Sequence, residues 1–519
     1  MPMRSTMILA LLCAVARGAP TADEVTSLPG WTGPLPMKIY SGYVNASAAL
    51  GIPCQVHYWY IESEGTPSSD PTILWTNGGP GASSMFGLLV ELGPFLLNEK
   101  SLVTGDYNKT GVPSLFRNEY SWTKLGSVLM FDWAPPVGFS YCHDDPTGDG
   151  FACGKWDDER MANLSYAALV GWYALFPERR SNDLYLTGES YAGIYVPKLA
   201  QQILLHDDPN VRPQLQGFAV GDGCLGTESG VCGSYPGGKG PWWDLLFLYG
   251  HHQFSTELFD ALVSQCGMPH LKYDQPPIDA AACSAALARV DEEKGGFFGY
   301  NLYDDCIYQE GLRRRRRRLD ALITLKEQVG RPEVVTVDAA ARVGPLRGHS
   351  WGGALNDYVC GGGDAYKVWV DHSAVRKALH VPVDSSFYDS DGGGPYHGSE
   401  KNLMPFYQHV AKTTKLRVLI YNGDTDPSIN SFEAANWTTH LGFTPTQPWR
   451  PWTLDACLRM GGYVTRYEHE RFDFLTIRGS GHMVPQFKPA QAFEFLGAWL
   501  RGEDWKRYNG SCTKPPERR

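Results

Sequence analysis

The chain has 519 residues, of which 43% are hydrophobic, 13% aromatic and 20% charged. This composition supports a large buried core with aromatic-lined pockets and excludes a disordered or fibrous protein. The net charge of −10 leaves no general basic surface, so nucleic acid is excluded as a partner. The length suits one α/β core enlarged by insertions.

The N-terminus, residues 1–19, is predicted to be a signal peptide. Arg4 supplies the positive start, an apolar run extends from Met7 to Ala16, and small residues up to Ala19 form a cleavage site. No later apolar run reaches the roughly 18 residues needed to span a bilayer. We therefore expect no membrane span, and entry into the secretory pathway with the vacuole, the lysosome or the cell exterior as destination.

Cysteines and glycosylation motifs agree with export. Of the 12 cysteines, Cys13 lies in the signal peptide, and the remaining eleven suit an oxidising compartment. Cys142 and Cys153 flank one short loop and Cys224 and Cys232 another, which predicts two local disulfides. Because eleven is odd, at least one thiol is free or pairs between chains. Five N-glycosylation sequons are present, at Asn45, Asn108, Asn163, Asn436 and Asn509.

No pattern in the sequence indicates a metal or a cofactor. There is no Cys-x-x-Cys pair, and no histidine cluster has zinc spacing. The segment Gly221–Gly226 fits the dinucleotide pattern G-x-G-x-x-G, but the Gly-rich residues that follow cannot form the helix such a site requires.

Residues 31–222 alternate between predicted strands and helices. The strands are predicted at 54–62, 72–77, 127–132, 183–187 and 216–221, and the helices at 157–175 and 191–205. This alternation indicates an α/β fold with a mostly parallel central sheet covered on both faces. We place the first part of the core at 20–222.

The alternation is lost in residues 223–350, which we interpret as a cysteine-containing insertion or lid over the core. It includes six consecutive arginines, Arg313–Arg318. Two interpretations remain open for them, a solvated and self-repelling loop or a cleavage site for a processing protease that recognises basic residues. In the second part of the core, 351–519, the α/β pattern resumes at 364–380, with strands at 416–422 and 472–477 and a final helix at 489–501.

Two serines compete as a nucleophile on a strand-to-helix turn. The segment Gly348–Gly352 matches G-x-S-x-G, whereas Gly188–Gly193 matches it loosely. The motif needs a strand before it and a helix after it, so that the serine hydroxyl is presented at the end of the sheet. Ser190 has both, but Ser350 follows Gly and Pro and precedes a poor helix. We therefore predict Ser190 as the nucleophile of a hydrolase and Ser350 as a loop residue.

A serine nucleophile needs a histidine base and an acid, and in α/β hydrolases they follow the serine in the order acid, then histidine. The strand 416–422 is followed by Asp424 and Asp426, and the strand 472–477 by the Gly-flanked His482. Catalytic loops gather at such strand ends. His482 is the predicted base, and the pattern alone does not choose between the two aspartates.

An oxyanion hole requires backbone N–H donors in a tight turn. The Gly-rich segment Asn77–Gly81 directly follows the strand 72–77, at the position where this fold supplies one donor. Tyr191, the residue after the nucleophile, supplies the second.

With these motifs in place, the chain resembles the serine carboxypeptidases. The resemblance covers most of 31–222 and 364–505. It rests on several independent motifs in one order, WTNGGPGASS, LVELGPF, LFPERRSNDLYLTGESYAGIYVPKLA, IYNGDTD and GHMVPQFKPAQAF. It implies an α/β-hydrolase fold and a serine-type carboxypeptidase that releases C-terminal amino acids from peptides and proteins.

The resemblance also implies a role for each matching residue. Asp426, the second aspartate of Gly-Asp-x-Asp, is the triad acid with Ser190 and His482. The backbone N–H groups of Gly79 and Tyr191 form the oxyanion hole. A further set binds the carboxylate of the substrate C-terminus, namely Asn77, the Gly78 backbone, Glu91 and Glu189.

The two glutamates predict a pH dependence. Two carboxylates that face a substrate carboxylate cannot all be ionised at close range, so at least one holds a proton and donates a hydrogen bond. We expect binding of a free C-terminus to be strongest at acidic pH.

Two departures from the family pattern limit what the resemblance implies. Ala82 stands where the family has a cysteine after NGGPG, which leaves Cys360 to pair elsewhere, with Cys54 as one suggestion. The doubled proline in FDWAPPVGFSYC differs from the family pattern in a segment that borders the pocket for the penultimate side chain of the substrate.

Alternative functions also remain open. One is an acyltransferase of the serine-carboxypeptidase-like kind, and another is a protective or chaperone-type binding protein with an incidental site. Retention of Glu91 and Glu189 favours the peptidase. The sequence leaves open whether the protein forms a homodimer.

Overall fold

The computed structural model describes residues 19–147, 153–206, 213–229, 231–232, 240–304, 306, 357–390, 396–455, 459–468 and 471–508. Four features predicted above lie outside these residues. They are nearly all of the signal peptide, the arginine run Arg313–Arg318, Ser350 and the sequon at Asn509.

Within the described residues, eleven strands form one large sheet in the order β1-β2-β6-β3-β9-β10-β12-β15-β14-β13, with β7 beside β2. The six strands from β6 to β15 in this order pair in parallel, and the pairs at both edges are antiparallel. Their bounds are β1 Ile39–Asn45, β2 Cys54–Ile61, β3 Thr72–Thr76, β6 Ser127–Phe131, β7 Tyr141–Cys142, β9 Leu184–Glu189, β10 Leu215–Gly221, β12 Arg417–Gly423, β13 Pro445–Thr453, β14 Met460–Tyr467 and β15 Phe472–Ile477.

All seven predicted strands are present as β2, β3, β6, β9, β10, β12 and β15. The sequence pattern missed four strands of this sheet, namely β1, β13 and β14, which lie at or next to its edges, and the two-residue β7 beside β2. Edge strands tolerate proline and glycine, and β13 contains three prolines, which hides it from a search for apolar runs. Two small two-stranded sheets are added, β4 Phe95–Leu96 with β5 Phe116–Arg117 and β8 Trp156–Asp157 with β11 Tyr396–His397.

Alternate residues of the parallel strands enter two separate hydrophobic cores, as strand geometry requires. In β12, for example, Val418 and Ile420 belong to one core and Leu419 and Tyr421 to the other. The first core is completed by α3 Asp158–Leu175, α4 Ala192–Leu205, α13 Met404–Thr413 and α14 Ser431–Thr439. The second is completed by α11 Gly362–Asp371, α12 Ser373–Ala378 and α16 Pro489–Arg501. The central sheet is thus covered on both faces.

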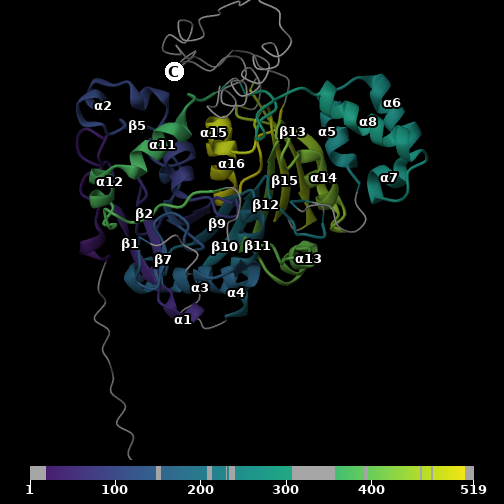
Figure 1. Cartoon of the computed structure of the whole chain (residues 1–519). Coiled ribbons are helices and arrows are strands. Elements are labelled where there is room, and N and C mark those ends of the chain that lie inside the picture. The colour runs from purple at the N-terminus through teal and green to yellow at the C-terminus, as the bar shows by residue number, and fades with distance from the viewer. Residues whose placement is uncertain are drawn as a thin grey trace, which may run out of the picture.

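The described part of the predicted insertion is a helical unit. It consists of α5 Trp242–Gly250, α6 Thr256–Cys266, α7 Met268–Tyr273 and α8 Ala280–Glu293, which share a third hydrophobic cluster. Figure 1 shows these four helices grouped at the upper right, beside the end of the sheet that holds β13 and β15. The remaining helical segments are α1 Ser47–Leu50, α2 Gly105–Thr110, α15 Val484–Phe487 and the short turns η1 Thr21–Asp23, η2 Gly87–Glu91, η3 Glu99–Leu102, η4 Trp122–Lys124 and η6 Pro177–Arg179.

The disulfides confirm part of the prediction and correct part of it. Cys142–Cys153 and Cys224–Cys232 are formed as predicted, and Cys266–Cys283 joins α6 to α8. The suggested pairing of Cys54 with Cys360 is wrong. Cys360 pairs with Cys306, and Cys54 is a free buried thiol at the start of β2, where its neighbour across the strands is the disulfide-bonded Cys142.

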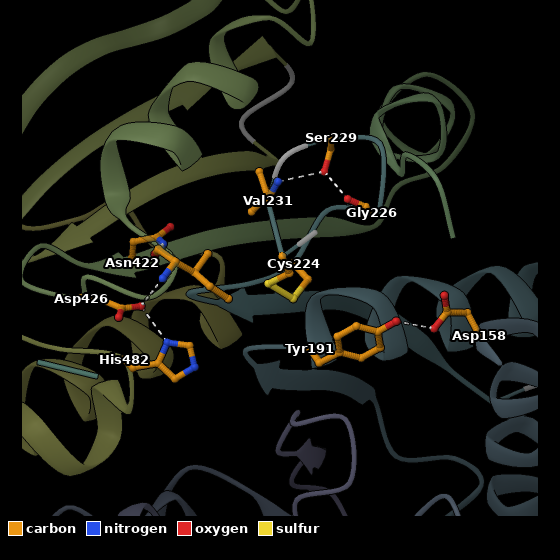
Figure 2. The surroundings of a disulfide bond; sticks show 11 residues. Asp158, Tyr191, Cys224, Gly226, Ser229, Val231, Asn422, Asp426 and His482 are labelled. Carbon is orange, nitrogen blue, oxygen red and sulfur yellow. Dashed lines mark hydrogen bonds and ion pairs between the residues drawn. A yellow bond between two sulfur atoms is a disulfide. The ribbon is translucent and has the colours of Figure 1, made fainter. Parts of the chain in front are cut away.

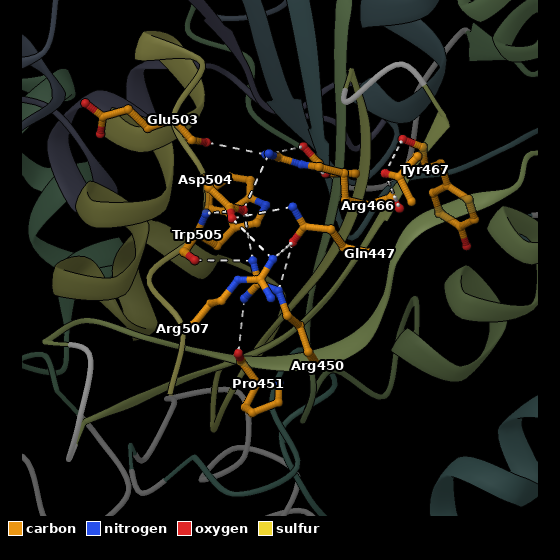
Figure 3. A network of polar contacts seen from close by, with 11 residues as sticks. Gln447, Arg450, Pro451, Arg466, Tyr467, Glu503, Asp504, Trp505 and Arg507 are labelled. Atoms are coloured by element: carbon orange, nitrogen blue, oxygen red, sulfur yellow. Dashed lines mark hydrogen bonds and ion pairs between the residues drawn. The ribbon is translucent and has the colours of Figure 1, made fainter. Parts of the chain in front are cut away.

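Residues 503–507, after α16, bind to the β13–β14 edge of the sheet through a network of polar contacts (Figure 3). Arg466 of β14 pairs with Asp473 of β15 at 2.8 Å and with Asp504 at 3.5 Å. Arg450 of β13 reaches the same Asp504 at 2.9 Å, and Trp505 is buried against this region. The network joins three antiparallel strands to the segment after α16.

Two sequence-derived surface predictions can be compared with the described residues. Asn45, Asn108 and Asn163 are exposed and Asn436 is partly buried, so the sequon on α3 is accessible although it lies in a helix. In the described part of the chain, no helix has the length and apolar character that crossing a membrane requires.

Candidate active site

Ser190 occupies a sharp turn between β9 and α4. Its φ of +64° lies in the left-handed region, which a serine adopts only under local constraint. Two glycines make the turn possible because neither position has room for a side chain. A Cβ on Gly188 would lie 2.5 Å from the Thr76 carbonyl oxygen, and one on Gly193 would lie 2.3 Å from the Cys224 carbonyl oxygen.

The glycine-rich loop after β3 lies directly on this turn. A Cβ on Gly78 would lie 2.3 Å from the backbone N of Tyr191 and 2.9 Å from Cβ of Ser190. Gly79, the next residue, has a φ of +104°, which favours glycine. The predicted oxyanion donors, the N–H groups of Gly79 and Tyr191, therefore come from two segments in close backbone contact.

His482 and Asp426 form the buried pair expected of a base and its orienting acid. His482 Nδ1 lies 2.7 Å from Asp426 Oδ2, and both side chains are almost fully buried (Figure 2). The N–H groups of Ser428 and Ile429 donate to the Asp426 carboxylate, at 2.8 and 3.2 Å. Because the carboxylate is held by backbone donors, it can fix the orientation of the imidazole.

Asp424, the other aspartate left open by the sequence, points elsewhere. Its carboxylate accepts a hydrogen bond of 2.6 Å from the Gly479 N–H. It braces the turn that leads to His482, and the structure brings only Asp426 onto the imidazole ring.

Sequence reasoning missed the contribution of the insertion to this site. The Tyr300 carbonyl oxygen accepts a 2.8 Å hydrogen bond from the His482 N–H, and the Tyr300 ring stacks on the imidazole at a centroid distance of 4.9 Å. The next residue, Asn301, is buried and accepts from the Thr425 hydroxyl at 2.9 Å. Tyr300 and Asn301 of the insertion therefore contact both loops that carry the acid and the base.

Asn77, Glu91 and Glu189 form one buried polar cluster. The Asn77 Nδ2 amide donates to both glutamates, 3.0 Å from each Oε1 atom. Its Oδ1 accepts from Trp75 Nε1 at 2.8 Å, which fixes the amide so that the NH₂ group faces the carboxyl groups. The Oε2 atoms of both glutamates are also buried, and the two carboxyl groups lie within hydrogen-bond reach of each other.

The pKa values of both glutamates are raised, so both stay protonated to a higher pH than an exposed glutamate. Burial raises the pKa of Glu91 to about 7. Burial and the adjacent charge of Glu91 raise the pKa of Glu189 well above its usual range. The pair therefore carries at least one proton in acidic solution, as the sequence predicts, and Glu91 ionises as the pH rises through about 7.

The cluster and the serine open into one pocket of about 300 Å³. Six of the nine predicted site residues line it, whereas Tyr191, Glu91 and Asp426 are not among the lining residues. The six are Asn77, Gly78, Gly79, Glu189, Ser190 and His482. Aromatic and flexible apolar side chains form much of the remaining lining, including Phe86, Tyr300, Tyr358, Tyr366 and Met483.

A third buried acid beside the triad, Asp222, was not among the predicted site residues. Its carboxylate accepts from the Gly423 N–H at 2.9 Å and from Asn422 Nδ2 at 3.2 Å. Polar atoms of Asp222, Asp426 and His482 all lie within 4.8 Å of one another. Burial, followed by the charges of Asp426 and Glu189, raises the pKa of Asp222 well above its usual range. Its position directly after the predicted strand 216–221 could have marked Asp222 as a candidate site residue in the sequence.

The raised glutamate pKa values predict that stability depends on pH. In the unfolded chain a glutamate titrates near 4.3, whereas Glu91 titrates near 7 in the folded protein. The stabilising contribution is therefore complete below about pH 4 and is lost as the pH rises toward 7, on the order of 3 kcal/mol for a shift of this size. We expect the Tm to fall between pH 5 and pH 7.5, and Glu91→Gln to flatten that fall.

Urea unfolding at several pH values measures this effect, with the exposed Glu228→Gln as the matched control. The prediction is contradicted if the free energy of unfolding falls equally steeply with pH in Glu91→Gln, in Glu228→Gln and in the unsubstituted protein.

Comparison with known proteins agrees with this fold and shows the family. Residues 29–502 match the family model described as serine carboxypeptidase, and the chain belongs to this family. It is 30% identical to serine carboxypeptidase 1 of Hordeum vulgare, with 93% of each protein aligned. It is 32% identical to the lysosomal protective protein of Mus musculus, over 96% of this chain and 99% of that protein.

A solved structure supports the fold. The prohormone-processing carboxypeptidase Kex1Δp of Saccharomyces cerevisiae superposes with a TM-score of 0.64 at 19% identity, covering 93% of this chain and 96% of that one. The fold is the α/β-hydrolase fold, and the protein is a serine-type carboxypeptidase of the serine carboxypeptidase family.

Proposed function

We propose that this carboxypeptidase releases one residue at a time from the C-termini of peptides and proteins, with Ser190 as its nucleophile. The observation that carries the proposal is the buried cluster of Asn77, Glu91 and Glu189, part of which lines the same pocket as Ser190. A proton-bearing carboxyl group can donate a hydrogen bond to a substrate carboxylate. Anchoring the terminal carboxylate beside the nucleophile confines cleavage to the last peptide bond.

The reaction proceeds by acyl transfer in two steps. Ser190 Oγ attacks the last peptide carbonyl carbon while its proton passes to His482, and the N–H groups of Gly79 and Tyr191 stabilise the resulting oxyanion. His482 then gives the proton to the leaving amine as the peptide bond breaks, and Asp426 stabilises the imidazolium. Water attacks the acyl ester by the same route and regenerates the Ser190 hydroxyl.

The test is a panel of N-blocked dipeptides at about pH 5, near the carboxyl pKa range, with release of the free C-terminal amino acid as the readout. The matched substrates are the same dipeptides with a C-terminal amide, which lack the carboxylate. We expect cleavage of the acids and at least about tenfold slower cleavage of the amides, because a charge-assisted hydrogen bond contributes roughly 1.5–3 kcal/mol. Equal rates would contradict the proposal, and preferential transfer of an acyl ester to an alcohol would favour an acyltransferase.

A pH profile of Glu189→Gln tests the anchoring cluster directly. As the pH rises, the Glu91–Glu189 pair gains negative charge that repels the substrate carboxylate, so KM of the unsubstituted enzyme is expected to rise at least about tenfold by pH 8. Glutamine stays neutral, so the rise in KM should be several-fold smaller while kcat is retained at acidic pH. The proposal about the pair fails if Glu189→Gln leaves the rise in KM unchanged, and Glu228→Gln serves as the surface control.

We also propose passage through the secretory pathway, with the vacuole, the lysosome or the cell exterior as destination, and cleavage within Arg313–Arg318. The four disulfides among the described residues support an oxidising compartment. Cys306–Cys360 spans the arginine run in sequence, so a cleaved protein would separate into two chains only after reduction. Electrophoresis with and without a thiol tests cleavage, and size-exclusion chromatography with light scattering tests for a homodimer.

A further inference from the structure

Asp158, the first residue of α3, is the centre of a buried hydrogen-bond network next to the nucleophile turn. Its Oδ1 accepts from the hydroxyls of Tyr191 at 2.9 Å and Tyr396 at 2.8 Å. Its Oδ2 accepts from the N–H groups of Ser399 and Glu400, each at 2.6 Å, and from the Ser399 hydroxyl at 3.4 Å. The Asp158 side chain is buried at the N-terminus of α3.

The Tyr191 side chain is held at its hydroxyl by the hydrogen bond to Asp158 and along its ring by aromatic packing. It packs edge-on against Tyr195 and Tyr396, with centroid distances of 5.3 and 5.6 Å. A Cβ on Gly398 would lie 2.6 Å from the Tyr191 hydroxyl oxygen, so the absence of a side chain there makes room for it. Burial raises the pKa of Tyr191, which keeps its hydroxyl a donor to Asp158. Figure 2 shows the ring directed from the turn toward Asp158, away from His482.

The other end of Tyr191 is its backbone N–H, which lies between the nucleophile and the glycine-rich loop. Gly78 approaches this nitrogen so closely that a Cβ there would lie 2.3 Å from it. The neighbouring Ser190 carbonyl oxygen accepts from the N–H groups of Gly193 and Cys224, at 2.9 and 3.0 Å. The amide is therefore held from the backbone on one side and through the tyrosine side chain on the other.

We propose that Asp158 is a positioning residue for the reaction, and that through the Tyr191 side chain it sets the place of the Tyr191 N–H in the oxyanion hole. The inference rests on the proposed function, which assigns that N–H to the oxyanion. A donor moved by a fraction of an ångström keeps the ground-state complex but weakens the transition state, so the loss should appear in kcat and leave KM unchanged.

Two tyrosine variants separate positioning from a structural role. Tyr191→Phe and Tyr396→Phe each remove one hydroxyl donor to the same oxygen of Asp158 and keep an aromatic ring. We expect Tyr191→Phe to lower kcat about tenfold with KM within about twofold, and Tyr396→Phe to keep kcat within about twofold. Similar changes in Tm for the two variants would show that the difference in kcat is not a difference in stability.

Gly398→Ala provides a second, independent displacement of the Tyr191 hydroxyl. Its methyl group meets the hydroxyl oxygen, which phenylalanine lacks, so we expect Gly398→Ala to lower kcat by a similar factor. The double variant with Tyr191→Phe should be no worse than Tyr191→Phe alone. The inference is overturned if Tyr191→Phe keeps the kcat of the unsubstituted enzyme, if Tyr396→Phe loses as much, or if the two losses in the double variant multiply.

The same variants are compared in their rate of labelling by a fluorophosphonate, whose phosphoryl oxygen enters the oxyanion hole. This rate does not depend on a peptide C-terminus. Slower labelling of Tyr191→Phe but not of Tyr396→Phe therefore supports the inference even if no dipeptide is cleaved, whereas equal labelling rates overturn it.

Discussion

Replacement of Ser190 by alanine is expected to lower kcat on a blocked dipeptide by a factor on the order of 10⁵–10⁶, with KM little changed. The size follows from the loss of the covalent step, since the oxyanion donors and the binding cluster remain and supply only residual catalysis. Alanine removes one oxygen atom from a turn whose conformation is set by backbone hydrogen bonds and neighbouring glycines. The Tm should therefore change little.

The matched control is Ser350→Ala, which removes the other serine that fits a nucleophile motif. It is expected to keep the activity of the unsubstituted enzyme and to remain labelled by a fluorophosphonate, whereas Ser190→Ala loses labelling. Retention of turnover by Ser190→Ala, or its loss in Ser350→Ala, would refute the assignment of the nucleophile.

The sequence was sufficient wherever function depends on local chain geometry. Ser190 could be preferred over Ser350, which matches the motif better, because the residues next to Ser190 predict a strand before it and a helix after it. The same holds for His482, which follows β15, and for the glycine-rich loop after β3. The parallel strands were predicted for a similar reason, since burial on both faces gives them nearly continuous apolar sequences.

The sequence was insufficient wherever a contact joins distant segments. Tyr300, which stacks on His482, comes from the insertion, and nothing in its neighbourhood indicates that partner. Asp158 begins a helix whose apolar pattern was evident, but its hydrogen bonds run to residues 191 and 396–400. The wrong suggestion for Cys360 has the same origin, because Cys306 is 54 residues away along the chain.

The choice between two aspartates shows how a single spacing can leave chemistry undetermined. Asp424 and Asp426 are two residues apart in the loop after β12, and either could have met the histidine. The resemblance to the family favoured Asp426. In the structure its carboxylate lies 2.7 Å from His482 Nδ1, while Asp424 accepts from the Gly479 N–H.

Replacement of Asp426 by asparagine is therefore expected to lower kcat by a factor on the order of 10⁴. The carboxylate accepts the Nδ1 proton of His482, which leaves Nε2 free to take the serine proton. An asparagine can present its NH₂ group to Nδ1 instead, which stabilises the tautomer that carries its proton on Nε2 and cannot act as a base. The Ser428 N–H donates to Asp426 Oδ1, whereas His482 lies on Oδ2, so an amide oxygen that keeps the Ser428 hydrogen bond leaves the NH₂ group toward the imidazole.

Asp424→Asn is the matched control, since it makes the same change two residues away in the same loop. It should cost less than about tenfold in kcat, because the asparagine oxygen can still accept from the Gly479 N–H. The readouts are kcat on a blocked dipeptide and the rate of fluorophosphonate labelling, both of which require His482 as base. If Asp424→Asn proves the more damaging of the two, the acid has been assigned to the wrong aspartate. If neither variant slows labelling, His482 is not oriented by either, and the hydrogen bond at 2.7 Å has a structural role only.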